Sequence, residues 1–321
     1  MRRKNHLPGI NRILQKVSLP VFVSFFLFCA GGPTQPQFPD PLEFESVWQF
    51  LKVYSIHQQR VPQNAFVYDS PEEMMESIKD TLRDGNYTRY GLLNHSLSKS
   101  RFSGTASGDD VTFYNVNSFT AMITISEFNT GTTYNEFLSV VPLAASYSDL
   151  ILDLRDNLGG DLKEMGSIIE CFLPAGKEYI LARERKYDSK TGKAETLEWH
   201  PWVTKRDSKP ELSNKKLTVL VNGRTASAAE ILAAALKDCY PAKLVGQQTY
   251  GKAIGQIILL RRGRPDLHIT YLQLRGISFG DYQGIGIKPD SIAFHKTLPA
   301  SPENFFASGY RLVREEEILS P

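Results

Sequence analysis

Short apolar segments that alternate with amphipathic ones constrain the fold more than any other feature of this 321-residue chain. Residues 150–154 and 217–221 are apolar runs with one polar residue each, a pattern typical of strands buried on both faces of a parallel sheet. Residues 162–173 are amphipathic and residues 226–236 are rich in alanine, which favours helices. The alternation therefore predicts an α/β domain whose parallel strands are joined by helical crossovers.

Two helices are predicted ahead of this region. Apolar residues recur at helical spacing over 42–56. A second helix, over 71–85, starts with Ser70 as N-cap, a proline at its first position and two acids in its first turn. With a polar loop over 94–110, they predict a small N-terminal helical region, residues 42–105. Further strands are predicted at 111–126, 177–187 and 195–204 (the last two around a turn at 188–192), 244–246, 254–261 and 268–274.

Composition excludes several classes of protein. The chain is 41% hydrophobic with a formal net charge of +2, which is too apolar and too weakly charged for a disordered protein. Near-neutral charge also argues against nucleic-acid binding, which requires a basic surface. Three cysteines cannot form a disulfide framework, and H-x-x-x-H and paired C-x-x-C motifs are absent. We therefore expect neither a metal nor a cofactor.

The N-terminus has the layout of a secretory signal peptide. Residues 1–30 contain five basic residues and no acid, and an apolar run of ten residues, 21–30, ends this segment. We expect cleavage after Ala30, export to the periplasm or cell envelope, and a linker over residues 31–41. A lipid anchor at Cys29, with peripheral membrane association, is the alternative, which Phe28 disfavours because lipoprotein signals place a small residue there. Removal of the signal leaves a net charge of −3.

Three polar or glycine-rich segments follow predicted strands: 153–160 (DLRDNLGG), 221–230 (VNGRTASAAE) and 249–256 (TYGKAIGQ). In open α/β sheets, ligands bind at the ends of strands. Each segment also has a simpler explanation: Ser227 and Glu230 fit a helix capping box, the two glycines fit a tight turn, and lysines are usually exposed. The presence of all three segments in one chain favours a functional site.

These segments resemble the motifs of the C-terminal processing (tail-specific) serine peptidases. The family's D-L-R-x-N-x-G-G, S-A-S-A-S-E-I and G-K-x-x-x-Q segments are matched by residues 153–160, 225–231 and 251–256, and Ser227 and Lys252 have the family's separation of 25 positions. Residues 284–290 resemble a G-x-G-x-x-P-D segment, and residues 87–90 resemble the end of the family's helical region. The resemblance covers about residues 42–295.

The resemblance implies a ClpP/crotonase-like α/β core, residues 106–321, that hydrolyses protein or peptide substrates with a Ser-Lys mechanism. Ser227 would be the nucleophile, Lys252 the general base and Gln256 the residue that orients the lysine. Gly159 or Gly160, together with Ala228, would donate backbone N–H groups to the oxyanion. Burial would have to lower the pKa of Lys252 from about 10.4 to about 7 or 8.

Two expectations about geometry follow. Residues four apart on a straight strand lie about 13 Å from each other, so Lys252 and Gln256 can meet only across a bulge or turn. Only about 25 residues separate Tyr90 from Val116, whereas a PDZ domain, which many members carry at this place, needs roughly 80 to 90. We therefore expect the PDZ domain to be absent.

The main alternative is a catalytically quiet protein that binds peptides or other ligands on the same fold. A crotonase-type acyl-CoA enzyme is disfavoured because it has no use for a Ser-Lys pair. A penicillin-binding enzyme is disfavoured because the S-D-N element is lacking, and a Ser-His-Asp hydrolase is disfavoured because G-x-S-x-G does not occur around Ser227.

Overall fold

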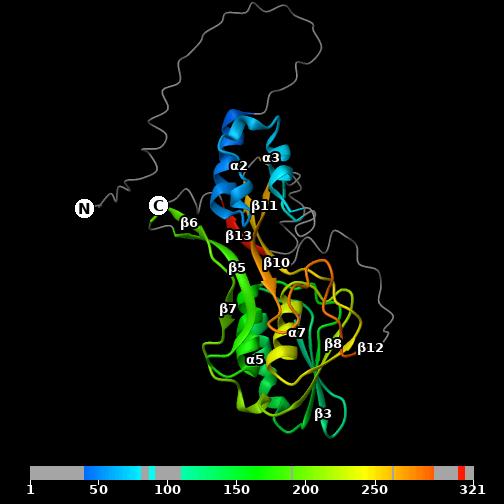
Figure 1. Cartoon of the computed structure of the whole chain (residues 1–321). Coiled ribbons are helices and arrows are strands. Elements are labelled where there is room, and N and C mark those ends of the chain that lie inside the picture. Colours follow the sequence, from blue (N-terminus) through cyan, green and yellow to red (C-terminus); the bar gives the residue numbers. More distant parts are fainter. Residues whose placement is uncertain are drawn as a thin grey trace, which may run out of the picture.

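The computed structural model describes residues 40–80, 87–90, 110–188, 191–261, 264–292 and 310–314. Figure 1 shows helices α2 and α3 at one end of the molecule and strands β3 and β8 at the other, with strands β10 and β11 running between the two ends. The predicted signal peptide, most of the linker and all but the last residue of the 94–110 loop lie outside the described residues.

One sheet has the parallel strands that the sequence predicts. Its strand order is β12 (Ser291–Ile292), β9 (Lys243–Gly246), β8 (Lys216–Val221), β4 (Asp149–Asp153), β3 (Thr120–Ile125) and β2 (Val111–Asn115). All neighbours in this sheet are parallel except β2 and β3, which form an antiparallel hairpin within the predicted 111–126 strand. Because the neighbouring strands β4, β8 and β9 are parallel, the segments that follow them emerge at the same edge.

Three helices pack with this sheet: α5 (Thr133–Ala144), α6 (Leu162–Phe172) and α7 (Ala228–Cys239). The side chain of Asp161 begins α6 by accepting hydrogen bonds from the N–H groups of Lys163 and Glu164, at 2.7 and 3.1 Å. Helix α7 is buried along most of its length, and the helices and strands share one hydrophobic core. The predicted α6 and α7 are confirmed, whereas the sequence patterns did not predict α5.

The second sheet is largely antiparallel. Its order is β13 (Tyr310–Arg314), β10 (Ile254–Leu260), β11 (Leu267–Arg275), β5 (Glu178–Asp188) and β6 (Lys193–Thr196), with β1 (Arg89–Tyr90) paired to β11 and β7 (His200–Val203) paired to β5. The predicted arms around the turn at 188–192 are confirmed. The second arm is divided between β6 and β7, which pair with different parts of β5.

The N-terminal helical region packs on the second sheet. It comprises α2 (Pro41–Tyr54), α3 (Pro71–Ile78) and the short 3₁₀ turns η1 (Gln58–Arg60) and η2 (Ala65–Val67); a third turn, η3 (Pro210–Leu212), lies in the core. Apolar side chains of α2 and α3 form one cluster with residues of β10 and β11, among them Ile257, Leu259 and Leu267. The helical region and the core are therefore joined by a shared hydrophobic interior.

The second predicted helix begins as expected but is shorter. The hydroxyl of Ser70 accepts a hydrogen bond from the Glu73 N–H at 3.1 Å, and Pro71 occupies the first helical position. The helix ends at Ile78 instead of continuing to Gly85, because Lys79 is extended at φ −67° and ψ 151°. The carbonyl of Lys79 accepts a hydrogen bond from the Arg60 guanidinium at 2.7 Å.

Within the described residues, Cys171 and Cys239 are both free thiols. No helix in this part of the chain combines the length and the apolar character that a membrane span needs. The same residues contain no group of His, Cys, Asp and Glu side chains arranged to hold a metal ion.

Candidate active site

The three segments that the sequence analysis singled out meet at the carboxyl edge of the parallel sheet. The Thr225 hydroxyl donates to the Leu154 carbonyl at 2.8 Å, and the Ala226 N–H donates to the Asn157 carbonyl at 2.9 Å. The Tyr250 N–H donates to the Thr225 carbonyl at 3.0 Å. These hydrogen bonds join the segments after β4, β8 and β9 into one polar cluster.

Ser227 lies at a sharp turn between β8 and α7. Its backbone has φ +56° and ψ −119°, a conformation that residues with a side chain rarely adopt. Such backbone strain costs about 1–3 kcal/mol and concentrates at functional sites. The turn has the strand–elbow–helix form that presents the nucleophilic serine in α/β-hydrolases, although the surrounding residues do not form a G-x-S-x-G motif.

The glycine pair lies directly against this elbow. A Cβ atom on Gly159 would come within 2.8 Å of the Ser227 Cβ and 2.9 Å of the Ala228 nitrogen. On Gly160 it would come within 2.2 Å of the Phe128 carbonyl oxygen. Both glycines have positive φ, at 103° and 136°, so they are required by space and by conformation. The simpler explanation of the two glycines, a tight turn, is thus correct, and this turn packs against Ser227.

The N–H of Gly159 already donates a hydrogen bond within the site. It donates to the Asn157 side-chain oxygen at 2.8 Å, and the amide nitrogen of this buried asparagine donates in turn to the Ile125 carbonyl at 2.9 Å. Ala228 is the first residue of α7, and amides in the first helical turn have no acceptor within the helix. Asn157 orients the glycine loop, a role that sequence reasoning missed although Asn157 belongs to the matched segment.

The carboxylate of Glu230 holds the serine elbow and the lysine segment together. One oxygen accepts hydrogen bonds from the N–H groups of Ser227 and Lys252, at 2.9 and 2.8 Å. The other accepts from the Gly251 N–H at 2.7 Å and the Thr249 hydroxyl at 2.6 Å. Burial raises the pKa of Glu230, and these four donors oppose that rise. The side chain forms its half of the predicted capping box and also reaches the third segment, residues 249–256.

Lys252 is fully buried, so its explanation as an exposed surface lysine is wrong. Burial lowers the pKa of its amine, Glu230 opposes this effect and the Arg89 charge adds to it, and together they bring the pKa from 10.5 to about 7. The Nζ atom lies 5.3 Å from the centroid of the Tyr87 ring. A large fraction of the amine is therefore neutral near pH 7 and able to accept a proton.

Gln256 lies directly after a register shift in β10, the kind of irregularity that the sequence analysis expected between Lys252 and Gln256. The register of β10 against β11 shifts between Gly255 and Gln256, and Lys252 precedes the strand. The Gln256 amide nitrogen donates to the main-chain carbonyl of Tyr87. Its side-chain oxygen is buried and has no hydrogen-bond partner in the described part of the chain. Lys252 and Gln256 thus both contact Tyr87.

Tyr87 and Arg89 are site residues that sequence reasoning did not identify. They belong to the 87–90 segment, which the analysis assigned only to the end of the helical region. The position of that segment beside Lys252 depends on the pairing of β1 with β11, where Arg89 lies opposite His268. Burial, together with the charges of Arg89 and Lys252, lowers the pKa of His268 to about 3.

The site contains a serine at a strand-to-helix elbow, a glycine pair beside it and a buried lysine of lowered pKa. These are the groups that a serine hydrolase needs as nucleophile, oxyanion donors and base. The model of peptidase family S41 matches residues 120–293, which contain all three segments. The chain therefore belongs to peptidase family S41.

Individual relatives agree with this assignment. The chain is 35% identical over 159 residues to carboxyl-terminal-processing peptidase 1, chloroplastic, of Arabidopsis thaliana, covering 50% of this chain and 29% of that protein. It is 36% identical over 151 residues to the carboxy-terminal-processing protease of Bartonella bacilliformis, covering 46% of this chain and 31% of that protein. The aligned region thus spans about a third of the length of these relatives.

The mixed α/β fold is also found in a solved structure. The photosystem II D1 C-terminal processing protease superposes with a TM-score of 0.57 at 17% identity, covering 83% of this chain and 96% of that one. At this identity the likeness shows the fold, including the N-terminal helices.

Proposed function

We propose that this protein is a serine endopeptidase that hydrolyses peptide bonds through Ser227 and Lys252. The observation that carries the proposal is a fully buried lysine with a pKa of about 7, held by Glu230 next to a serine in an elbow conformation. Neither feature stabilises the fold, because a buried amine and a strained backbone both cost free energy. Membership of a peptidase family supports the same assignment.

In the proposed reaction, neutral Lys252 takes the proton of the Ser227 hydroxyl while the serine oxygen bonds to the scissile carbonyl carbon. The lysine then donates this proton to the departing amine as the peptide C–N bond breaks, leaving an acyl-enzyme. Water repeats the sequence, with Lys252 again accepting and returning a proton, and releases the carboxylic acid. The buried oxygen of Gln256 would accept a hydrogen bond from the lysine and orient it.

The oxyanion hole in this proposal uses the N–H groups of Gly160 and Ala228. Gly159 is the weaker candidate because its N–H donates to Asn157. The Ala228 N–H lies at the start of α7, where the helix dipole favours negative charge. An oxyanion-hole donor typically contributes about 10²- to 10³-fold to the rate.

Further parts of the proposal concern the whole protein. Its substrates are proteins or peptides, and the names of the relatives favour cleavage near carboxyl termini. We propose that the core is of the ClpP/crotonase type and that the chain acts without a PDZ domain. We further propose that it is exported by the signal in residues 1–30. Recognition of a free C-terminus would then depend on the peptidase core and the helical region.

The test compares peptide and casein cleavage by the full chain with that by Ser227→Ala and Lys252→Ala. Exposed Ser139→Ala and Lys163→Ala are matched controls. Both site variants should lose at least about 10³-fold in kcat, as nucleophile and base substitutions do in other serine peptidases, and the controls should lose nothing. A fluorophosphonate should label the wild type and not Ser227→Ala. Equal cleavage by all variants would contradict the proposal, and tight peptide binding without turnover by the wild type would favour the catalytically quiet alternative.

A further inference from the structure

Every residue of the segment 87–90 contacts the β10–β11 hairpin. Tyr87 provides the carbonyl that accepts from Gln256 and the ring that faces the Lys252 amine. The Thr88 and Thr270 hydroxyls are hydrogen-bonded at 3.0 Å. Arg89 and Tyr90 form β1, which pairs with His268 and Leu267 of β11. A displacement of this segment would therefore change the surroundings of Lys252 and Gln256 together.

β1 has only two residues, so its pairing with β11 is a weak constraint by itself. Its far end is held by a side chain: the Tyr90 hydroxyl donates to a carboxylate oxygen of Glu43 at 2.7 Å. Burial, together with the neighbouring Glu43 carboxylate, raises the pKa of Tyr90 well above its usual value, which keeps the hydroxyl protonated as a donor at all physiological pH values.

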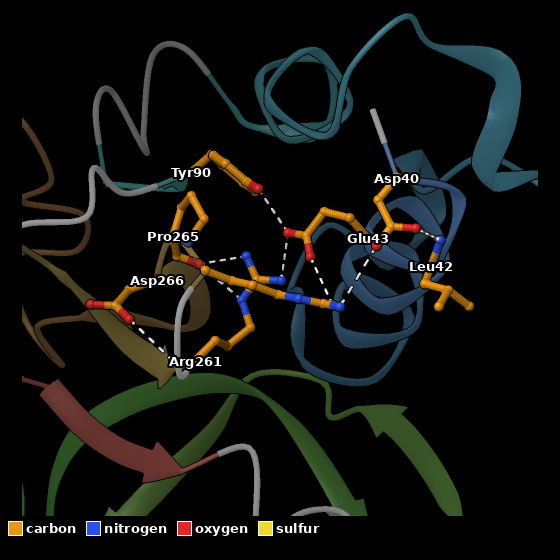
Figure 2. A network of polar contacts seen from close by, with 8 residues as sticks. Asp40, Leu42, Glu43, Tyr90, Arg261, Pro265 and Asp266 are labelled. Carbon is orange, nitrogen blue, oxygen red and sulfur yellow. Dashed lines mark hydrogen bonds and ion pairs between the residues drawn. The ribbon is translucent and has the colours of Figure 1, made fainter. Parts of the chain in front are cut away.

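Glu43 lies in the first turn of α2 and is buried between two arginines of the β10–β11 connection. Its carboxylate contacts Arg261 at 2.6 Å and Arg264 at 3.0 Å. Arg261 is itself fixed, because its Nε donates to the Pro265 carbonyl at 2.9 Å and its guanidinium lies 5.6 Å from the Tyr90 ring centroid. Figure 2 shows that Tyr90 and Arg261 both reach the Glu43 carboxylate, Tyr90 from above and Arg261 from below in this view.

A fixed position for the segment is needed because several groups set the protonation of Lys252. Those that face the amine are the Glu230 carboxylate from α7, the Arg89 guanidinium from β1, the His268 ring from β11 and the Tyr87 ring. Two of the four belong to the 87–90 segment. If the segment moves away, Lys252 loses a cationic neighbour and part of its cover from water, and both changes favour the charged amine.

We propose that Glu43 is a positioning residue of the active site: through the Tyr90 hydroxyl it holds the 87–90 segment against Lys252 and Gln256. Glu43 touches no reacting atom and lies on the helical region, outside the segment matched by the family model. The inference rests on the proposed Ser-Lys function and assigns the helical region a part in the chemistry.

Tyr90→Phe is the variant that tests the proposal most directly. It removes the hydroxyl and leaves the ring, the contact of the ring with Arg261 and both ion pairs of Glu43 in place. We expect the lower limb of the pH profile of kcat/KM to shift by about half a unit to one unit toward higher pH, which lowers activity below the limb by about three- to tenfold. The deficit should nearly disappear at pH 9, where the amine is neutral in both proteins, and it should lie in kcat more than in KM.

Tyr68→Phe is the matched control, because Tyr68 packs against the same hydrophobic cluster, whereas the hydroxyl that donates to Glu43 is that of Tyr90. It should leave the limb unmoved. Arg264→Gln is a second test variant that weakens the other side of Glu43 at a half-exposed position, and it should shift the limb in the same direction by a smaller amount. It also decides the question if Tyr90→Phe does not fold.

A purely structural role predicts a different result. If Tyr90→Phe and Arg264→Gln lower the melting temperature or reduce activity equally at all pH values, with the limb unmoved, the positioning role is overturned while the proposed function stands. If the wild type shows no Lys252-dependent limb, the proposed function fails, and this inference fails with it. A limb that shifts in the test variants and not in Tyr68→Phe supports the proposal.

Discussion

At the scale of single residues, the site depends on two features that are unfavourable for stability. Ser227 has positive φ, and Lys252 has an amine fully removed from water. The carboxylate of Glu230 partly offsets both, because it accepts hydrogen bonds from the backbone of each residue. Glu230 thus fixes the position of the strained serine relative to the buried lysine.

The pH dependence of activity follows from the lysine. With a pKa of about 7, Lys252 is mostly charged at pH 6 and mostly neutral at pH 8. Because only the neutral amine accepts a proton, we expect kcat/KM to fall about tenfold for each pH unit below 7 and to level off above it. Initial rates on a fluorogenic peptide between pH 5 and 9 measure this profile. An unchanged rate between pH 5 and 8 would show that Lys252 is not the base.

Stability should depend on the same amine. The folded-state pKa of about 7 lies below the unfolded value of about 10.4, so the buried amine destabilises the protein fully below pH 7. The destabilisation decreases as pH rises toward the unfolded value. Lys252→Met should therefore be inactive and raise the free energy of unfolding by up to about 4 kcal/mol at pH 7, with a smaller gain at pH 9. Urea unfolding at both pH values measures this, and a loss of stability at pH 7 would contradict it.

At the scale of elements, three loops after parallel strands bring the chemistry together. The loop after β4 supplies the glycine pair, the loop after β8 supplies Ser227, and the loop after β9 supplies Lys252. Hydrogen bonds between the loops maintain this arrangement, and close contacts leave no room for a side chain on Gly159.

Gly159→Ala tests this packing. Its Cβ would lie 2.8 Å from that of Ser227, at a backbone φ of 103°, so either the elbow or the glycine loop must move. We expect a loss of at least about 10²-fold in kcat, the size of a lost oxyanion donor. Gly176→Ala is the matched control, since Gly176 also has positive φ, at 79°, but nothing lies within 4 Å of the added Cβ. Its activity should be normal, and equal activity in the two variants would show that the close approach of the glycine loop is not needed.

At the scale of the whole molecule, we expect the helical region to unfold together with the second sheet. Side chains of α2 and α3 share a hydrophobic cluster with β10 and β11, and β10 begins two residues after Lys252. The ion pairs of buried Glu43 lie at the far end of the same hairpin. Damage to the helical region should therefore also disturb the candidate active site.

Leu51→Ala tests this coupling. Leu51 is completely buried in the cluster, so its truncation should cost about 2–5 kcal/mol. We expect the variant to unfold in one transition, with loss of activity and of helical circular dichroism at the same urea concentration. An early transition that removes helical signal while peptide cleavage persists would show that the helical region unfolds independently.

Much of the local structure was predictable from sequence because it depends on neighbouring residues. Apolar runs and helical periodicity can be recognised within stretches of about ten residues. These patterns predicted β4, β8, α2, α6 and α7. The Ser70 cap was predicted in the same way. Helix α5 was missed: Thr132 provides no side-chain cap, and Pro142 lies within its last turn. The early end of α3 at Ile78 was missed too, because no stop residue marks it.

By itself, the sequence determined the alternation of strands and helices, the three polar segments at strand ends and the need for a bulge before Gln256. Only the tertiary structure decided which groups act on one another: that Glu230 spans from Ser227 to Lys252, that Asn157 occupies the Gly159 N–H, and that Tyr87 and Arg89 face the lysine. These contacts join residues far apart in the chain. The burial that lowers the pKa of Lys252 exists only once those segments have packed around it.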